Sequence, residues 1–392
     1  MTALEETPAG FVRDPEAAAD ATGATEVPGA PRTDGLAQLL GHMVEAHGSD
    51  LFVKAGSSPR LRVNGRLQPT PFASPDPSQV DRLVQSLLPA SKADELAANG
   101  EADFAIGVPS LGRFRVHAYR QRGSLAVVFR RVLPGIPTWQ QLGLPPVDER
   151  LTAEGPGLVL VTGPAGSGKT TTLNALIDRV NSTRAAHIVT IEDPIEFLHA
   201  DKQSLVSQRE VGSDTGQLTE GLRRAIRQGP DVLVASELPD LSALQAALDA
   251  ASTGALVFAT MGTTSAADTV SRIVEYFPEG QKRQARRQLA VVLRAIVSQR
   301  LVERADGKGR IAAVEVLTST PKVAECIEGP EHLYDLGRLI VDGRYHGMQT
   351  FDQSLFALAR DGLVSVRDAL AAADEPEDLR IELQQAGLVA PY

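Results

Sequence analysis

Cysteine is almost absent from this chain, which contains a single one, Cys326, among 392 residues. One cysteine excludes an internal disulfide framework and any zinc site built from several cysteines. Long apolar runs are absent too, since none approaches the ~18 residues that a transmembrane helix needs. The N-terminus lacks the basic start and apolar core of a secretory signal. We therefore expect a cytoplasmic protein, one that would reach a membrane only through partners.

Excess positive charge is absent as well. The chain has 39 basic and 49 acidic side chains and a formal net charge of −10, which argues against nucleic acid as a partner. The hydrophobic content of 43% and the charged content of 22% are ordinary for a globular protein. The length allows two domains with sizeable cores.

Two segments of different composition open the chain. Residues 1–34 carry seven acidic and two basic side chains, a net charge of −5, and too few apolar groups to offset their ordering entropy. We predict a disordered acidic tail there. Apolar residues at helical and strand spacing then predict a small α+β domain on an antiparallel sheet over residues 35–133. Its expected elements are a helix at 36–44, strands at 51–53, 60–63 and 66–67 with a hairpin turn at 64–65, a helix at 80–88, and strands at 113–119 and 125–131.

A second pattern begins after residues 134–150, which are rich in proline and glycine and which we interpret as a linker. Over residues 151–320, short apolar runs alternate with helical segments, as in a mainly parallel α/β sheet. Residues 321–392 are predicted to be helical. The expected strands are 158–161, 188–191, 232–235 and 256–260, with a helix around 241–248 and a hairpin of 297–303 and 311–317.

A glycine-rich stretch follows the first of these strands and precedes apolar residues at helical spacing. It fits G-x-x-x-x-G-K-[ST], the phosphate-binding loop of nucleoside triphosphatases. The glycines let backbone N–H groups surround phosphates, Lys169 can reach the β- and γ-phosphates, and Thr170 can ligate Mg²⁺. The alternative is a chance glycine-rich turn, which the flanking strand and helix disfavour. The predicted nucleotide-binding residues are Gly163, Pro164, Ala165, Gly166, Ser167, Gly168, Lys169, Thr170 and Thr171.

Nucleotide hydrolysis also needs carboxylates to orient water and hold Mg²⁺, and strand ends are where a parallel sheet presents them. Glu192 follows the second strand and is the first candidate for positioning or deprotonating water. Asp193 and Glu196 are candidates for bracing the turn instead, and a solvated acidic turn before a proline is the alternative for the whole segment. Glu237 follows the third strand, where a carboxylate can bind Mg²⁺ through water.

Basic side chains gather in three places despite the acidic balance. Most surface arginines are solvated or paired with acids, and that is the default for each of them. Clusters of this density still suggest faces that meet phosphate or an acidic neighbour. The clusters are Arg113, Arg115, Arg120, Arg122, Arg130 and Arg131 at the end of the small domain, Arg223, Arg224 and Arg227 on one predicted helix, and Lys282, Arg283, Arg286, Arg287 and Arg294 on another.

Together, these segments resemble the hexameric secretion-type motor ATPases, and most closely the twitching-motility ATPases of type IV pili. The resemblance extends over residues 35–365. Its phosphate loop alone is shared with very many proteins, whereas the ordered set of motifs is far more specific. The motifs are Ser49-Asp50-Leu51, Phe114–Gly123, the phosphate loop, Thr190–Phe197, Gln208–Gly212, Pro230–Val234 with Ser236-Glu237, Phe277-Pro278 and Gly347–Gln353.

The resemblance implies a PAS-like small domain, a RecA-like P-loop NTPase domain and a helical C-terminal part. It implies ATP and Mg²⁺ as cofactors, with Thr170 and Glu237 at the metal and Glu192 and Glu237 in catalysis. Six subunits would form a homohexameric ring at the inner face of the cell membrane, working against the platform protein of the pilus. Arginines of the small domain would complete each site, and we favour Arg115, Arg120 and Arg130.

The chain departs from the family pattern at strand ends near the phosphate loop. The family's Gly-Glu-Met-Arg-Asp is here Ser236-Glu237-Leu238-Pro239-Asp240, which keeps the carboxylate and replaces the arginine by Pro239. Gly262 takes the place of the histidine in the family's His box. Ala324 and Glu328 stand where the C-terminal retraction motif has arginines. These changes predict that nucleotide binding is intact and that ATP hydrolysis is weakened. They put pilus retraction in doubt.

Three hypotheses follow. The first is a Mg²⁺-dependent ATPase motor of a type IV pilus, of the retraction type, working as a homohexamer. The alternative is an accessory or regulatory subunit that binds ATP, turns it over slowly and joins a ring with an active paralogue. An assembly or type II secretion motor is a third reading, which the single cysteine disfavours because many such motors carry a four-cysteine metal module.

Overall fold

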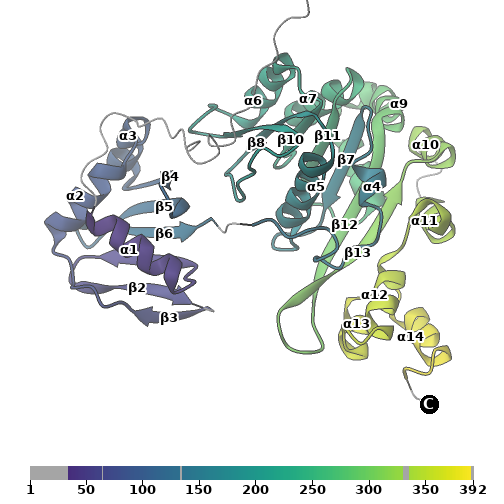
Figure 1. Ribbon diagram of the computed structural model, residues 1–392. Helices are drawn as coiled ribbons and strands as arrows, with labels where there is room; N and C mark the ends of the chain where they lie inside the picture. The colour runs from purple at the N-terminus through teal and green to yellow at the C-terminus, as the bar shows by residue number, and fades with distance from the viewer. Residues whose placement is uncertain (1–33, 64, 133–134, 330–334, 390–392) are drawn as a thin grey trace, which may run out of the picture. The chain divides into compact units, whose positions relative to one another are not determined.

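The structure, a computed structural model, describes residues 34–63, 65–132, 135–329 and 335–389. The chain divides into two compact units between Arg131 and Val132, each with its own sheet (Figure 1). The predicted acidic tail lies outside the described residues, except for Asp34, which begins the first helix. In the described part of the chain, no helix is both long and apolar enough to span a bilayer.

The first unit is built on a six-stranded antiparallel sheet with the strand order β3-β2-β1-β6-β5-β4. Its elements are α1 (Asp34–Glu45), β1 (Asp50–Lys54), β2 (Ser57–Val63), β3 (Arg66–Pro69), α2 (Pro77–Leu87), α3 (Ala90–Asn99), β4 (Glu101–Val108), β5 (Gly112–Gln121) and β6 (Ser124–Arg131). The predicted hairpin forms, with Val63 paired to Arg66. The sequence patterns did not predict α3, which fully buries only Leu96, or the edge strand β4.

One face of this sheet is apolar and carries the helices. Along β5, Phe114, Val116 and Ala118 are buried while the residues between them are partly exposed, as the alternation of side chains in a strand requires. Apolar residues of α1, α2 and α3 join these side chains in one core. α2 begins at a capping box formed by Asp76 and Gln79. Polar residues at the alternate positions of β5 therefore lie on the face away from this core.

The second unit is built on a seven-stranded sheet with the order β13-β12-β7-β11-β10-β8-β9 (Figure 1). Neighbouring strands are parallel except for the hairpin β12–β13 at one edge. All predicted strands of this unit form, and β9 was not predicted. Its elements are α4 (Asp148–Leu151), β7 (Gly157–Thr162), α5 (Lys169–Thr183), β8 (His187–Glu192), β9 (Leu205–Glu210), α6 (Leu218–Ala225), η1 (Ile226–Gln228), β10 (Val232–Ala235), α7 (Leu241–Ser252), β11 (Leu256–Met261), α8 (Ala266–Glu275), η2 (Glu279–Gln281), α9 (Lys282–Val292), β12 (Leu293–Glu303), β13 (Arg310–Thr318), α10 (Pro321–Glu328), α11 (Leu336–Asp342), η4 (Gly343–His346), α12 (Phe351–Arg360), α13 (Val366–Ala372) and α14 (Pro376–Gln385).

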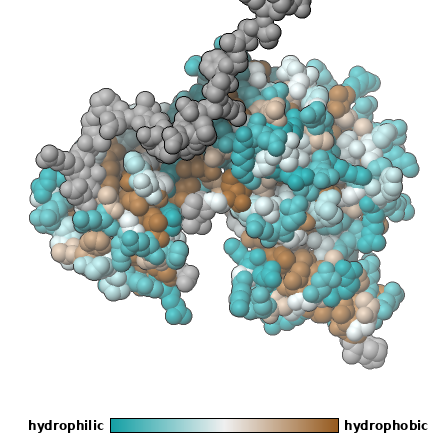
Figure 2. All heavy atoms as spheres, viewed as in Figure 1, coloured by the Kyte–Doolittle hydropathy of each residue, from teal (hydrophilic) through white to brown (hydrophobic). Residues whose placement is uncertain are grey.

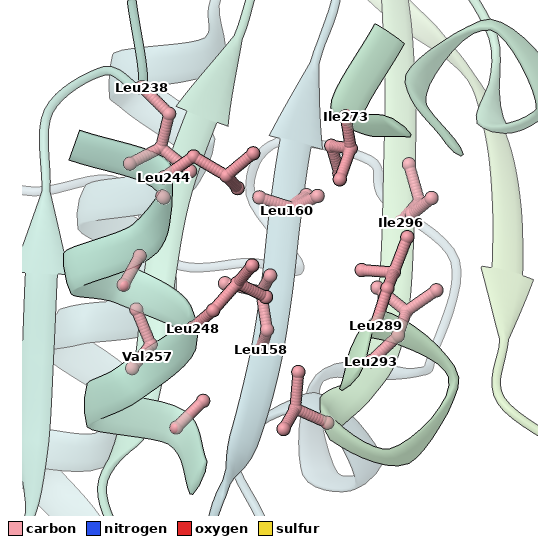
Figure 3. Packing of buried hydrophobic residues seen from close by; sticks show 14 of the residues in the cluster. Leu158, Leu160, Leu238, Leu244, Leu248, Val257, Ile273, Leu289, Leu293 and Ile296 are labelled. Atoms are coloured by element: carbon pink, nitrogen blue, oxygen red, sulfur yellow. The ribbon is translucent and has the colours of Figure 1, made fainter. Parts of the chain in front are cut away.

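The middle of this sheet is buried on both faces. Along β7, Leu158 and Leu160 belong to one apolar core together with Leu248 of α7 (Figure 3). Val159 and Val161 belong to a second core, which includes residues of α5. A strand covered on both faces has a continuous apolar sequence, which is why the runs in this unit predict strands well.

The segment interpreted as a linker packs into the second unit over much of its length. Trp139 is 2% exposed, and its Nε1 donates a hydrogen bond to the carbonyl oxygen of Pro145 at 2.6 Å. Leu144 and Val147 are buried in the same cluster as Val159 of β7. The prolines and glycines predict an irregular backbone, but the apolar side chains between them are removed from water by the sheet.

The C-terminal helices have a core of their own. α12, α13 and α14 pack together with Val302, Ile311 and Ala313 of the β12–β13 hairpin. The helical character predicted beyond residue 320 is found in the described residues of this region. Figure 2 shows hydrophilic side chains over most of the visible surface of the second unit.

Candidate nucleotide-binding site

The glycine-rich loop joins β7 to α5, and its glycines have backbone angles that other residues rarely adopt. The φ values are +146° at Gly163, +77° at Gly166 and +90° at Gly168. A Cβ atom on Gly163 would collide with the carbonyl oxygen of Gln299 and with Ser167. Gly168 is the N-cap of α5, so the first N–H groups of that helix point into the loop without partners inside the helix. The loop therefore has the conformation that phosphate binding needs.

Lys169 begins α5 and folds back over the loop. Its Nζ donates hydrogen bonds to the carbonyl oxygens of Gly163 at 2.8 Å and Pro164 at 3.1 Å. Partial burial lowers the pKa of Lys169, and the nearby negative charge of Glu237 opposes that shift. Phosphate oxygens form stronger, charge-assisted hydrogen bonds than neutral carbonyls do. A bound nucleotide would therefore draw this ammonium group away from the two carbonyls.

The carboxyl ends of four neighbouring strands, β7, β11, β10 and β8, meet at the same edge of the sheet as the loop. The N–H of Gly163 donates to the carbonyl oxygen of Met261 at 3.3 Å, and the N–H of Leu238 donates to that of Thr260 at 3.0 Å. The N–H of Asp193 donates to Ser236 Oγ at 3.2 Å. These bonds tie the strand ends together. This edge is where ligands bind in parallel sheets.

Glu237 follows β10 and is exposed. Its negative charge is close enough to Lys169 to raise the pKa of that lysine. Thr170, in the first turn of α5, is half buried. Glu237 and Thr170 are thus on elements that end or begin at one edge, where oxygen ligands suit a hard cation. Among the described residues, no group of three or more His, Cys, Asp or Glu side chains could hold a metal ion. A nucleotide-bound Mg²⁺ does not need such a group, because phosphates and water supply most of its ligands.

Glu192 is the last residue of β8 and is 4% exposed. Its Oε1 accepts hydrogen bonds from Thr190 Oγ1 at 2.6 Å and from Gln208 Nε2 at 2.9 Å. Burial raises the pKa of Glu192, and these two hydrogen bonds oppose the shift. A buried carboxylate with a raised pKa at a ligand-binding edge is suited to accept a proton.

Two residues of β9 support this strand end, and sequence reasoning assigned no role to either. Gln208 lies opposite Thr190 in the β8–β9 ladder, and its amide group also donates to the carbonyl oxygen of Phe197 at 2.9 Å. Glu210 is buried and accepts a hydrogen bond from the N–H of Ile195 at 3.0 Å. Glu210 therefore braces the turn after Glu192, where the sequence suggested Asp193 or Glu196, both of which are exposed. The sequence signal for Gln208 and Glu210 was the motif Gln208–Gly212, in which the sequence patterns predicted no strand.

Two of the family departures, Gly262 and Pro239, lie at this same edge. Gly262 directly follows the β11 residue Met261, which is paired with Thr162 of β7. A Cβ atom built on Gly262 would find no heavy atom within 4 Å, so a side chain there has room. Pro239 is exposed, and its carbonyl oxygen accepts a hydrogen bond from the Tyr276 hydroxyl at 3.1 Å. The edge thus lacks the histidine and the arginine of the family pattern, and a side chain at Gly262 would have room.

The favoured arginines belong to the first unit. Arg115 and Arg130 stand directly opposite each other on β5 and β6, on the sheet face away from the helices. Arg130 Nε donates to the buried carboxylate of Asp50 at 2.8 Å, while the arginine side chain stays largely exposed. Arg120 is paired with the buried Leu125, so by alternation it projects to the opposite face. The sheet therefore places Arg115 and Arg130 side by side and Arg120 on the other face.

Several residues of the other two basic clusters are held by local partners. Arg294 is in β12 and not on the predicted helix. Its guanidinium group donates to the carbonyl oxygens of Ala153, Glu154 and Pro156, which gives it a structural role. Arg224 is paired with Glu220 at 2.6 Å on the surface of α6. The prediction that Arg294 lies on one helix with the other basic residues of its cluster is therefore wrong.

Comparison with known proteins adds independent evidence. The family model described as type II/IV secretion system protein matches residues 135–349. The chain is 40% identical to the type IV pilus ATPase PilU of Pseudomonas aeruginosa, over 88% of this chain and 91% of that protein. It is 39% identical to the type IV pilus retraction ATPase PilT of the same organism, over 88% of this chain and 99% of that protein. A crystal structure of the pilus retraction motor PilT with bound ADP matches with a TM-score of 0.81 and 38% identity, over 88% of this chain and 98% of that chain.

Proposed function

The chain belongs to the type II/IV secretion system protein family of ATPases, and we propose that it is a motor of a type IV pilus that hydrolyses ATP to drive pilus retraction. The observation that carries this proposal is the shared sheet edge. There, the phosphate loop, Lys169, Glu192 and Glu237 come from three different strand ends. Relatives named as pilus ATPases match nearly the whole chain, both units included, which favours a motor over an isolated nucleotide-binding domain.

The proposal includes a finer division of the fold. Residues 35–133 form a PAS-like domain, 151–320 a RecA-like ATPase core, and 321–392 a helical region, with residues 134–150 between the two domains. The antiparallel sheet with helices on one face supports the first assignment. The parallel sheet with a phosphate loop after β7 supports the second.

Each site residue has a proposed role. Backbone N–H groups of the loop bind the phosphates, Lys169 neutralises the β- and γ-phosphates, and Thr170 with Glu237 holds Mg²⁺, which would neutralise charge on the leaving phosphates. Glu192 orients the attacking water and accepts its proton, since its carboxylate is buried and has a raised pKa. Arg115 and Arg130, with Arg120, supply positive charge from the small domain.

The assembly we propose is a homohexameric ring, with nucleotide at the subunit interfaces. The ring would act as a peripheral complex at the inner face of the cell membrane, against the platform protein of the pilus. The names of the relatives support this setting. Domain closure on ATP would convert binding and hydrolysis into movement.

A second candidate is an accessory subunit that binds ATP and hydrolyses it slowly. Pro239 and Gly262 favour it, because the edge lacks an arginine and a histidine that the family places there. Loss of one electrostatic group typically costs about 10²–10³ in rate. Such a subunit would join a mixed ring with an active paralogue.

The motor and the accessory subunit predict different phenotypes for cells in which the nucleotide site of this chain is disabled. We expect cells whose only copy carries Lys169→Ala to assemble surface pili but to stop retracting them, as measured by twitching on agar and by pilus retraction under a microscope. A matched control is Lys202→Ala, which removes a lysine paired with Asp178 on the same unit at 2.6 Å. Normal retraction in the Lys169→Ala cells would refute the motor and favour the accessory role.

A further inference from the structure

The underside of the phosphate loop rests on β12, the strand beside β7. β12 and β7 run parallel, with Val297 opposite Val161 and Ser298 opposite Thr162, and the hydroxyl groups of Ser298 and Thr162 are hydrogen-bonded at 2.9 Å. The next residue, Gln299, is 1% exposed and lies alongside the loop. β12 therefore continues past the end of β7 at the level where the loop begins.

The Gln299 side chain makes a direct contact with the loop. Its Nε2 donates a hydrogen bond to the carbonyl oxygen of Ser167 at 2.5 Å, across 132 residues of sequence. The backbone of Gln299 also limits the loop, because its carbonyl oxygen occupies the space that a Cβ atom on Gly163 would need. A Cβ atom on Gly168 would lie 3.0 Å from Gln299 Nε2. The first and last glycines of the motif thus pack against this one residue.

This contact fixes the direction of a backbone N–H group. In a trans peptide, the C=O of one residue and the N–H of the next point in opposite directions. Because the Ser167 carbonyl group points toward Gln299, the N–H of Gly168 points away from Gln299 and toward the inside of the loop. Gly168 is the N-cap of α5, and N–H groups at that position are the ones that bind phosphate.

Within the described residues, no other side chain donates a hydrogen bond to the Ser167 carbonyl oxygen. The buried Ser167 Oγ and Gln299 Oε1 have no hydrogen-bond partner there. On the upper side, Lys169 holds the carbonyl oxygens of Gly163 and Pro164, but this contact is the one a phosphate would take over. The Gln299 amide is then the side-chain contact that persists when nucleotide is bound.

We propose that Gln299 is a positioning residue that keeps the phosphate loop in its binding conformation and so sets the affinity for the β-phosphate of a nucleotide. The inference rests on the proposed role of the loop as the nucleotide site. It assigns to β12 a part in nucleotide binding although no atom of Gln299 needs to touch the ligand.

The test compares two methionine variants of the full chain. Gln299→Met removes the amide donor at nearly constant volume. Gln349→Met is the matched control, since Gln349 Nε2 also donates to a backbone carbonyl, that of Val314 at 3.0 Å, in the same unit. ADP and AMP affinities are measured by calorimetry, with thermal unfolding of each apo variant. We expect Gln299→Met to bind ADP about 10-fold more weakly, the loss typical when one partner of a buried hydrogen bond is removed.

The result for AMP makes the test specific, because AMP has no β-phosphate. We expect its affinity to change by less than about twofold in both variants, and ADP affinity to be unchanged in Gln349→Met. Gln299→Glu replaces the donor by an acceptor that faces the Ser167 carbonyl oxygen. It should weaken ADP binding at least as much as Gln299→Met does. In hydrolysis, KM for ATP should rise while kcat changes little.

Three outcomes would overturn the inference. One is ADP affinity of Gln299→Met within twofold of wild type. Another is an equal loss for the Gln299 and Gln349 variants in proportion to their thermal destabilisation, which would mean a structural role only. The third is an equal loss for ADP and AMP. Absence of ADP binding by the wild-type chain would overturn the nucleotide site itself and this inference with it, so the two failures are distinct.

Discussion

Replacing Glu192 by glutamine should separate catalysis from stability. In the wild type, Glu192 Oε1 accepts hydrogen bonds from Thr190 and Gln208. The amide oxygen of the substituted side chain in Glu192→Gln can accept the same two bonds, so neither buried donor loses its partner. The variant thus avoids the roughly 1–3 kcal/mol that an unpaired buried polar group costs. What it loses is the ability to take a proton from water, which is worth about 10²–10⁴-fold in rate.

Stability should respond in the opposite direction from activity. Burial raises the pKa of Glu192 in the folded state. A group with a raised folded pKa gives stability that is full below its unfolded pKa and is lost as pH rises through the folded pKa. Glutamine has no such loss. The unfolding temperature of Glu192→Gln should therefore match the wild type at about pH 4 and exceed it as the pH rises through the folded pKa of Glu192.

The assay is steady-state phosphate release at saturating ATP and Mg²⁺, paired with thermal unfolding from pH 4 to 8. Glu192→Ala is the control, because it removes the acceptor of Thr190 Oγ1 and one of the two acceptors of Gln208 Nε2, so activity and stability should both fall. Hydrolysis by Glu192→Gln within threefold of wild type would refute the assignment of the base. A variant that is less stable than wild type at pH 8 would refute the reasoning about burial.

Three further results are expected. Glu237→Gln, at an exposed position, should lower the rate on the order of 10²-fold while unfolding free energy stays within about 0.5 kcal/mol, and excess Mg²⁺ should restore part of the rate; an unchanged Mg²⁺ dependence would contradict this. Gly262→His with Pro239→Arg should raise the rate by at least about 10-fold, because Gly262 has open space around it and both positions follow strands at the edge that carries the loop. An unchanged rate would show that these losses do not limit hydrolysis. Burial lowers the pKa of His199 to about 4, so its contribution to stability is present above the unfolded pKa of about 6.5 and is lost as pH falls toward 4. Urea unfolding between pH 4 and 7 should show this loss, and His199→Asn should flatten it; an equally steep curve in the variant would disprove it.

The sequence predicted the fold best where strands are buried on both faces. The run around Leu160 and the strand 232–235 have short continuous apolar sequences, and the phosphate loop carries glycines whose angles only that residue adopts readily. β9 was missed because it lies at the edge of the sheet and none of its first five residues is fully buried. The same lack of burial hid α3 in the first unit.

The candidate site could be predicted only in part, for a physical reason. Motif residues such as Lys169, Glu192 and Glu237 are recognisable because their chemistry is local to a strand end. Contacts between segments far apart in sequence leave no such pattern. The Gln299–Ser167 hydrogen bond and the role of Arg294 depend on which strand lies beside β7, and that order is fixed by packing. Composition similarly hid the burial of Trp139, because proline and glycine around it favour a linker.

Hydrolysis of ATP by the purified full chain is the most direct measurement of whether this sheet edge is a working motor site. The wild-type chain should release phosphate at a rate that depends on Mg²⁺ and saturates with ATP, and Lys169→Ala should abolish that rate while the folded structure is retained by circular dichroism. Phosphate release that is no faster in the wild type than in Lys169→Ala would contradict the assignment.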